Sequence, residues 1–157
     1  MIGKKSPFEI QTVIANALYS DATLAALAVT LFGKAQTVNS GFDPKKPPQA
    51  AKLPWLTVAL DTTGSNTDFN VVDYSFLIGA AVQIDPTQST VSGVITYAGL
   101  EKVYDYAEKI YDVVYNALLA DSSENGYEIM SIGAIQYDND IPFVNFYFNA
   151  TASVELA

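Results

Sequence analysis

Residues 71–85 read Val-Val-Asp-Tyr-Ser-Phe-Leu-Ile-Gly-Ala-Ala-Val-Gln-Ile-Asp, and this stretch decides the fold. Apolar side chains recur at every second position: Val72, Tyr74, Phe76, Ile78, Ala80, Val82 and Ile84. The intervening positions include Asp73, Ser75, Gln83 and Asp85. This alternation predicts a long strand with one buried face and one largely solvated face.

Three further strands and a short edge strand follow from the same rules. Residues 54–60 are apolar on both faces and rich in strand-forming side chains. Residues 127–137 and 143–156 flank Asp138-Asn139-Asp140, a turn signal with Pro142 just after it, and predict a hairpin. Val38 is expected to begin the edge strand.

Helices are predicted before the first strand and between the strand pairs. Ser6, Pro7 and Glu9 supply an N-cap, a first-turn proline and a capping-box partner for a helix that ends near Tyr19. A shorter helix follows over residues 22–28, capped by Asp21. The longest helix covers residues 97–119, and its apolar arc of roughly 200° exceeds the roughly 100° that faces one sheet. We therefore expect a second cover for this helix, from the N-terminal helices or another subunit.

The element order predicts an α+β class, with one domain spanning residues 1–157. It is expected to hold a mainly antiparallel sheet of about four strands, with helices packed on one face. Long loops are predicted at about residues 34–52, 61–71 and 86–96, where proline, glycine and small polar residues gather.

The composition excludes several classes of function. The chain has no His, no Cys and no Arg, and its eight lysines face 17 acids, for a net charge of −9. Without Cys or His it lacks a thiolate nucleophile, a Cys-ligated zinc site and a ready base near neutral pH. The negative charge disfavours a wrapped nucleic-acid complex. The sequence predicts a protein that is not an enzyme and binds no cofactor.

Three groups of acids are candidates for metal or catalytic sites. Residues 121–126 resemble the start of a calcium loop, but the twelfth position is Ile132 where a bidentate Glu is required, so Gly126 is predicted to be a helix-to-strand turn. Asp138 and Asp140 fit a hairpin turn. The third group is Asp61, Asp68, Asp73 and Asp85, and their spacing in the sequence does not require any two of them to form a general acid/base pair. No catalytic, cofactor-binding or metal-ligating residue is therefore predicted.

Neither a targeting segment nor a membrane span is expected. Lys4 and Lys5 are not followed by a long apolar core. The most apolar early stretch, residues 24–32, is shorter than the roughly 20 residues that cross a bilayer. The sequence predicts a soluble protein made in the cytoplasm.

The element order and one short motif resemble the tail terminator proteins of tailed bacteriophages. The resemblance covers roughly residues 8–156, while the long loops at 34–52 and 86–96 depart from the more compact members of that family. The features that carry it are an N-terminal helix, the turn Leu18…Asp21…Leu24…Leu27, a Pro-rich loop, the strand start Leu53-Pro54-Trp55-Leu56-Thr57-Val58, the strand end Val82-Gln83-Ile84-Asp85, the helix start Ala98-Gly99-Leu100-Glu101-Lys102-Val103, and a closing hairpin through Phe146.

The resemblance implies a structural virion protein that forms a ring, usually a hexamer, at the head-proximal end of the tail tube. Such a ring terminates tail polymerisation and joins the tail to the head. The implied partners are further copies of the chain, the tail tube protein, the head–tail connector and, in a contractile tail, the sheath protein. DNA passes through the lumen without specific binding, and no membrane is involved. The implied location is the tail or neck of the virion, assembled in the host cytoplasm.

Ring formation requires each subunit to contact its neighbours. We expect these contacts on the apolar arc of the helix at 97–119 and on or beside the loops at 34–52 and 61–73, with plain intramolecular packing as the alternative. The candidate subunit or partner contacts are Lys45, Lys46, Trp55, Asp61, Asp68, Phe69, Asp73, Tyr106 and Val113.

Other functions stay open at this point. A neck or head-completion connector subunit, or the terminator of a phage-like injection device, fits the same sequence. A small ligand-binding module or an Asp-dependent hydrolase requires a pocket with converging carboxylates.

Overall fold

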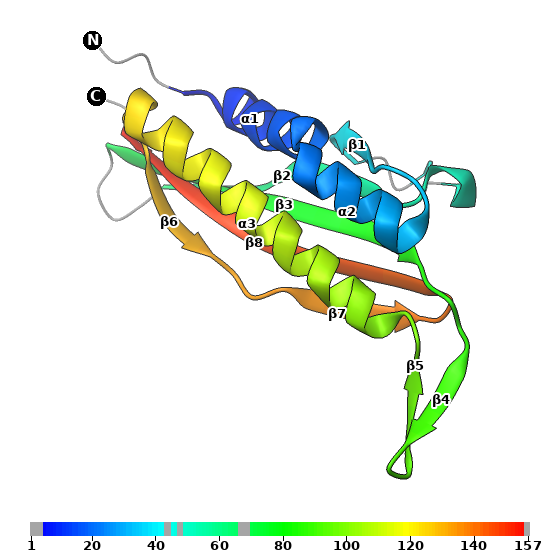
Figure 1. Ribbon diagram of the computed structural model, residues 1–157. Helices are drawn as coiled ribbons and strands as arrows, with labels where there is room; N and C mark the ends of the chain where they lie inside the picture. Colours follow the sequence, from blue (N-terminus) through cyan, green and yellow to red (C-terminus); the bar gives the residue numbers. More distant parts are fainter. Residues whose placement is uncertain (1–4, 43–44, 47–48, 66–69, 156–157) are drawn as a thin grey trace.

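The computed structural model describes residues 5–42, 45–46, 49–65 and 70–155 of the 157-residue chain. Within these residues, three α-helices lie on one face of a six-stranded sheet (Figure 1). The helices are α1 (Pro7–Ser20), α2 (Ala22–Phe32) and α3 (Leu100–Asn125), and a 3-10 turn, η1, covers Ala50–Lys52. The predicted α+β class, with helices on one face, is confirmed.

The sheet has the strand order β1-β2-β3-β8-β6, and β7 also pairs with β8. Only the β1–β2 pair is parallel among the described strands, so the sheet is mainly antiparallel as predicted. It holds six strands instead of about four, because the edge strand expected from Val38 is present, beginning at Thr37, and the expected strand at 127–137 is two strands. The strands are β1 (Thr37–Ser40), β2 (Trp55–Ser65), β3 (Val71–Gln83), β6 (Glu128–Ile132), β7 (Gln136–Asp140) and β8 (Phe143–Glu155).

A second hairpin stands where a loop is predicted at residues 86–96. Strands β4 (Gln88–Val91) and β5 (Val94–Tyr97) pair in antiparallel register, with Val91 opposite Val94. The two residues between them have left-handed backbone angles, with φ of 50° at Ser92 and 80° at Gly93. A two-residue turn with positive φ at both positions matches the right-handed twist of a hairpin. The loop prediction is therefore wrong for this segment.

Two other loop boundaries also move. β2 continues through Asp61 to Ser65 past a shift in register between Leu60 and Thr62, so the loop expected at 61–71 is shorter. The turn of the last hairpin lies at residues 141–142, since Asp138 and Asp140 pair with Asn145 and Phe143. The predicted turn at 138–140 is thus a strand.

The helix ends are set by local side chains. Ser6 and Glu9 form the predicted capping box, with Ser6 N donating to Glu9 over 2.6 Å and Glu9 N donating to Ser6 over 3.2 Å. Asp21 accepts from Leu24 N over 2.7 Å and begins α2. α3 runs on through residues 121–125 and ends at Gly126, whose φ is 69°. The segment compared with a calcium loop is therefore helical, and Gly126 is the predicted turn residue.

The hydrophobic core lies between the helices and the sheet. Phe76, Ile78 and Val82 of β3 point toward the helices, as do Val144, Phe146 and Phe148 of β8, and all are buried. Helices α1 and α2 both pack against α3, and β6 lies along the other side of α3. Most of the wide apolar arc of α3 is therefore covered within the chain, by the sheet and the N-terminal helices, while Tyr104 remains 41% exposed.

No single helix in the described part of the chain is long and apolar enough to cross a membrane. Together α1 and α2 have sufficient length and composition, but they bend by 57° at Asp21. Their apolar residues Ile10, Ile14, Leu18 and Leu24 are buried against the rest of the fold.

Candidate interaction surfaces

The sheet carries an apolar hollow on the face opposite the helices. Strand register places Ala81 of β3 between Trp55 of β2 and Asn145 of β8, and Gly79 between Thr57 and Tyr147. In β3 and β8 these residues alternate with the buried positions that pack under the helices, so they face away from the helices, as do the paired Trp55 and Thr57 of β2. The hollow has a volume of about 510 Å³. It is lined by Phe42, Leu53, Trp55, Thr57, Leu77, Gly79, Ala80, Ala81, Phe143, Asn145, Phe146 and Tyr147.

The floor and rim of the hollow follow from two local features. A Cβ on Gly79 would lie 3.3 Å from the Thr57 methyl group, so the absence of a side chain at Gly79 leaves space at the bottom of the hollow. Thr57 Oγ1 donates to the carbonyl of Gly41 over 2.7 Å, and Gly41 N donates to the carbonyl of Val58 over 2.6 Å. These bonds hold Phe42 beside Trp55, where their ring centroids are 5.9 Å apart. None of the residues that line the hollow is charged.

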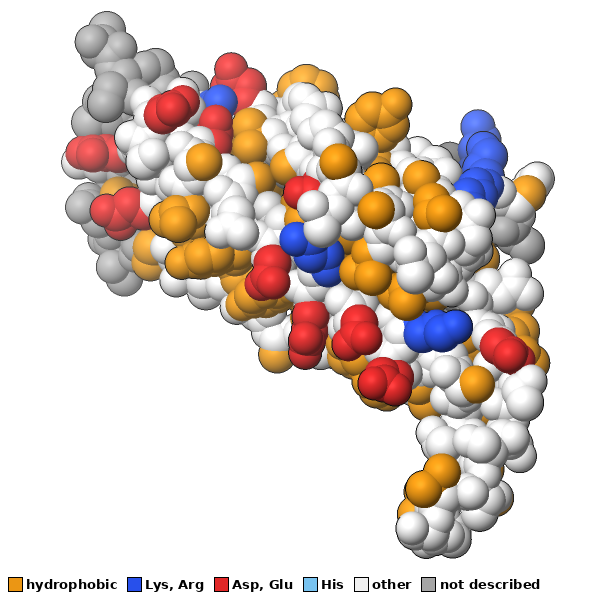
Figure 2. All heavy atoms as spheres, in the orientation of Figure 1, with side chains coloured by type: hydrophobic (Ala, Val, Ile, Leu, Met, Phe, Trp, Pro, Cys, Tyr) orange, Lys and Arg blue, Asp and Glu red, His pale blue; other side chains and the backbone are white. Residues whose placement is uncertain are grey.

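The β4–β5 hairpin is a second apolar surface, and it projects beyond the sheet (Figure 1). Val91, Val94 and Ile95 at its tip have 64%, 65% and 63% of their surface exposed. No residue from 86 to 100 is charged. In Figure 2 the projecting tip shows hydrophobic and uncharged polar side chains, whereas acids gather along α3.

The base of the hairpin is fixed to the body of the protein. Asp85 Oδ1 accepts hydrogen bonds from Thr87 Oγ1 over 2.6 Å and Thr87 N over 2.9 Å, and these bonds lower the pKa of Asp85. Ala98 N donates to the carbonyl of Thr87 over 3.0 Å. A Cβ on Gly99 would lie 2.5 Å from the Ile84 Cβ, so only glycine allows this approach. These contacts join the two ends of the hairpin to each other, and Ile84 N donates to the carbonyl of Pro142 over 2.8 Å, which joins this base to the last sheet hairpin.

The structure separates the nine residues expected to make contacts. Trp55 is also only 7% exposed, but it lines the hollow on the open face of the sheet, where Phe42 packs beside it. Lys45 and Lys46 are exposed in the loop after Phe42. Asp68 and Phe69 lie outside the described residues. Tyr106 and Val113 are buried in the core, 0% and 7% exposed, because the N-terminal helices cover that side of α3. We therefore remove Tyr106 and Val113 from the candidate contacts.

Among the candidate acids that the structure describes, Asp85 is separated from Asp61 and Asp73 by most of the length of β3. Asp61 accepts from Asn149 Nδ2 over 3.1 Å on the open face of the sheet. Asp73 lies near the start of β3 and Asp85 just beyond its far end, twelve residues away along an extended strand. Among the described residues no group of three or more acidic side chains is arranged to hold a metal ion.

Tyr106 leads to a prediction about stability. Its ring packs edge-on against Phe32 at 5.1 Å and Phe146 at 6.4 Å, but its buried hydroxyl has no hydrogen-bond partner. Burial raises the pKa of Tyr106. Tyr106→Phe keeps the ring and removes the unpaired hydroxyl, so we expect the free energy of unfolding to rise by about 1 kcal/mol. Urea unfolding measures this, and a loss of stability in this variant would contradict the burial of an unpaired hydroxyl.

The sequence signals for these surfaces differ in strength. The hairpin has a local signal, Ser92-Gly93 between Thr90-Val91 and Val94-Ile95, which the assignment of residues 86–96 to a loop overlooked. The hollow has none, because Phe42, Trp55 and Phe143 come together only through the pairing of distant strands.

Comparisons with known proteins give distant likenesses among solved structures alone. No family model matches the chain, and no curated protein matches it. Among solved structures, a chain from the virion of a native gene transfer agent particle is similar, with a TM-score of 0.46 and 16% sequence identity. The similarity covers 92% of this chain and 93% of that chain. Because the identity and the TM-score are low, neither the fold nor the function is argued from this similarity.

Proposed function

We propose that this chain is a structural virion protein that forms a ring at the end of a phage-like tail tube. In this role it ends tube polymerisation and joins the tail to the head connector. The observation that carries the proposal is the presence of two exposed, uncharged surfaces on one protomer, the hollow and the hairpin tip. The choice of the tail terminator role among virion proteins rests on the order of helices and strands, which resembles that of tail terminators.

Apolar surface of this kind favours assembly over catalysis. Contiguous exposed apolar patches on soluble proteins mark interaction sites. Aromatic side chains are enriched at the centres of protein interfaces, and the hollow presents Phe42, Trp55, Phe143 and Tyr147. Its lining offers no converging carboxylates, which a hydrolase of the type considered above would require.

The net charge of −9 is compatible with a ring around passing DNA. Acids on the exposed side of α3, including Glu101, Asp105, Glu108 and Asp112, would repel phosphates from any wall that they line. DNA is therefore proposed to traverse the lumen without specific contacts. The proposed location is the tail or neck of the virion.

Assembly with the tail tube protein of the same virus tests the role. Native mass spectrometry of the purified chain should give a closed species of about six times the 16.9 kDa protomer mass, alone or with tube protein present. Added to polymerising tube protein, the chain should shorten the tubes, and electron microscopy should place it at one tube end.

The possible results separate the alternatives. Rings that leave tube length unchanged but bind the head connector would indicate another neck subunit. A strict monomer under every condition, including with tube protein, would overturn the proposal.

A further inference from the structure

We propose, on the basis of the ring-forming function above, that the β4–β5 hairpin of one copy packs into the apolar hollow of the next copy. The contact is head-to-tail: each subunit gives its hairpin to one neighbour and receives a hairpin from the other. Heterologous contacts of this kind close into rings when the rotation between copies allows it. The hairpin is thus the proposed donor element and the open face of the sheet its receptor.

The exposure of the hairpin points to a partner. A two-stranded hairpin alone is marginally stable in water. This one pairs only β4 with β5 and stands apart from the six-stranded sheet. Its three aliphatic tip residues, Val91, Val94 and Ile95, are nevertheless about two-thirds exposed. Burying them against a neighbour would remove this apolar surface from water and stabilise the hairpin.

The rigidity of its base lowers the cost of binding. The Asp85–Thr87 hydrogen bonds and the close approach of Gly99 to Ile84 order the base of the hairpin within a single protomer. A pre-organised element loses less conformational entropy on association than a disordered loop. The Ser92–Gly93 turn fixes the tip in the same way.

Charge favours a second copy as the occupant of the hollow. Each protomer carries a net charge of −9, so a contact between two copies is least opposed where it brings no acids together. Residues 86–100 contain no charged side chain, and neither does the lining of the hollow. These two surfaces therefore allow self-association without burying like charges. A basic partner would instead be drawn to the acids along α3.

The direction of the hairpin argues for a neighbour as its receptor. The hairpin leaves the end of the sheet and points away from the body, so its tip lies away from its own chain (Figure 1). The hollow lies on the sheet face, with its floor at Gly79 and Ala81. One protomer thus presents both halves of the contact at separate places, which is the requirement for a head-to-tail ring.

A pair of charge substitutions tests the hairpin. Val94→Asp puts a carboxylate on the tip, and burying it unpaired should weaken assembly about tenfold or more. Val29→Asp is the matched control, because Val29 is an exposed valine, 51% exposed, on α2. Sedimentation or native mass spectrometry should find Val94→Asp largely monomeric and Val29→Asp assembled. Urea unfolding of both variants shows whether each still folds.

Crosslinking identifies the receptor, and the absence of cysteine from the chain removes background. Val94→Cys and Asn145→Cys are made separately, mixed and treated with a short bismaleimide. We expect a Val94–Asn145 crosslinked dimer from the mixture and little product from either variant alone. The double variant should give a ladder that ends at the ring size, whereas a two-fold exchange of hairpins would stop at the dimer.

The outcomes distinguish this contact from the ring-forming function itself. Rings that persist in Val94→Asp, or Val94→Cys chains that crosslink to one another but not to Asn145→Cys, would overturn the hairpin contact and leave the ring function standing. A wild-type chain that never assembles, with or without tail tube protein, would overturn both.

Discussion

Replacing Phe146 with alanine is expected to lower the free energy of unfolding by about 3–5 kcal/mol. Phe146 is 1% exposed near the start of β8. Its ring lies 6.4 Å from that of Tyr106 on α3 and 5.9 Å from that of Tyr137 on β7. Truncation therefore leaves a cavity where helix and sheet meet. Since folded domains are stable by only about 5–15 kcal/mol, this loss is a large fraction of the total.

Urea unfolding followed by tryptophan fluorescence measures the loss, because Trp55 is the single tryptophan of the chain. Phe143→Ala is the matched control, with the same residue type on the same strand but on the open face of the sheet and 40% exposed. It should cost less than about 1.5 kcal/mol. Equal losses in the two variants would contradict the assignment of the helix-side face of β8 as the core.

The regular elements were predictable because their patterns are local. The period-two alternation in residues 71–85 fixes which face of β3 is buried, and Phe76, Ile78 and Val82 are buried as expected. The start of α1 is specified by three residues that lie close together in the sequence, Ser6, Pro7 and Glu9. Gly126 ends α3 because its left-handed backbone angle suits glycine.

The missed features depend on contacts between distant parts of the chain. Tyr106 looks like an interface residue on a helical wheel, and only the packing of α1 and α2 on the same side of α3 shows that it is buried. The strand expected at 127–137 has a continuous pattern, yet its two halves pair with different parts of β8. Between them Gly133 N still donates to the carbonyl of Asn149 over 2.7 Å, but residues 133–135 belong to neither strand. The hollow arises from register, which no single segment encodes.

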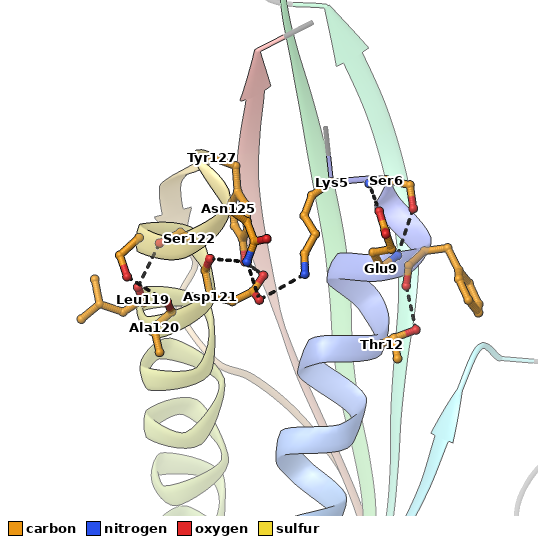
Figure 3. A network of polar contacts seen from close by, with 12 residues as sticks. Lys5, Ser6, Glu9, Thr12, Leu119, Ala120, Asp121, Ser122, Asn125 and Tyr127 are labelled. Carbon is orange, nitrogen blue, oxygen red and sulfur yellow. Dashed lines mark hydrogen bonds and ion pairs between the residues drawn. The ribbon is translucent and has the colours of Figure 1, made fainter. Parts of the chain in front are cut away.

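Asp121 is expected to contribute the largest polar effect, about 2–3 kcal/mol on replacement by alanine. Figure 3 shows its carboxylate between the start of the chain and the end of α3. Oδ2 accepts from the hydroxyl of Tyr127 over 2.8 Å, and Oδ1 accepts from Lys5 Nζ over 3.2 Å and Asn125 Nδ2 over 3.0 Å. Asp121→Ala would leave the hydroxyl of Tyr127, a residue only 4% exposed, without its acceptor.

The unfavourable position of Asp121 at the end of a helix offsets only part of the stability lost in Asp121→Ala. Asp121 lies in the last turns of α3, where a negative charge is disfavoured by about 0.3–1 kcal/mol, so its removal returns part of that amount. The Lys5 ion pair is partly exposed, with its two side chains 19% and 16% accessible, and we expect Lys5→Ala to cost no more than about 1 kcal/mol. The hydrogen bond from buried Tyr127 therefore outweighs the helix-end effect, and we expect Asp121→Ala to be destabilising.

A double-mutant cycle isolates that bond. Tyr127→Phe alone should cost about 1–2 kcal/mol, and Asp121→Ala combined with Tyr127→Phe should cost less than the sum of the single changes, because the unpaired hydroxyl is gone.

Burial, together with the hydrogen bond to Asp121 and its charge, raises the pKa of Tyr127. The unfolded chain loses this proton near pH 10 while the folded chain keeps it, so the stabilisation is complete below about pH 10 and falls as the pH rises further. Tyr127→Phe should lose less stability than the wild type between neutral pH and about pH 11. Strict additivity of the two substitutions, with unchanged alkaline sensitivity, would show that Asp121 and Tyr127 do not act together.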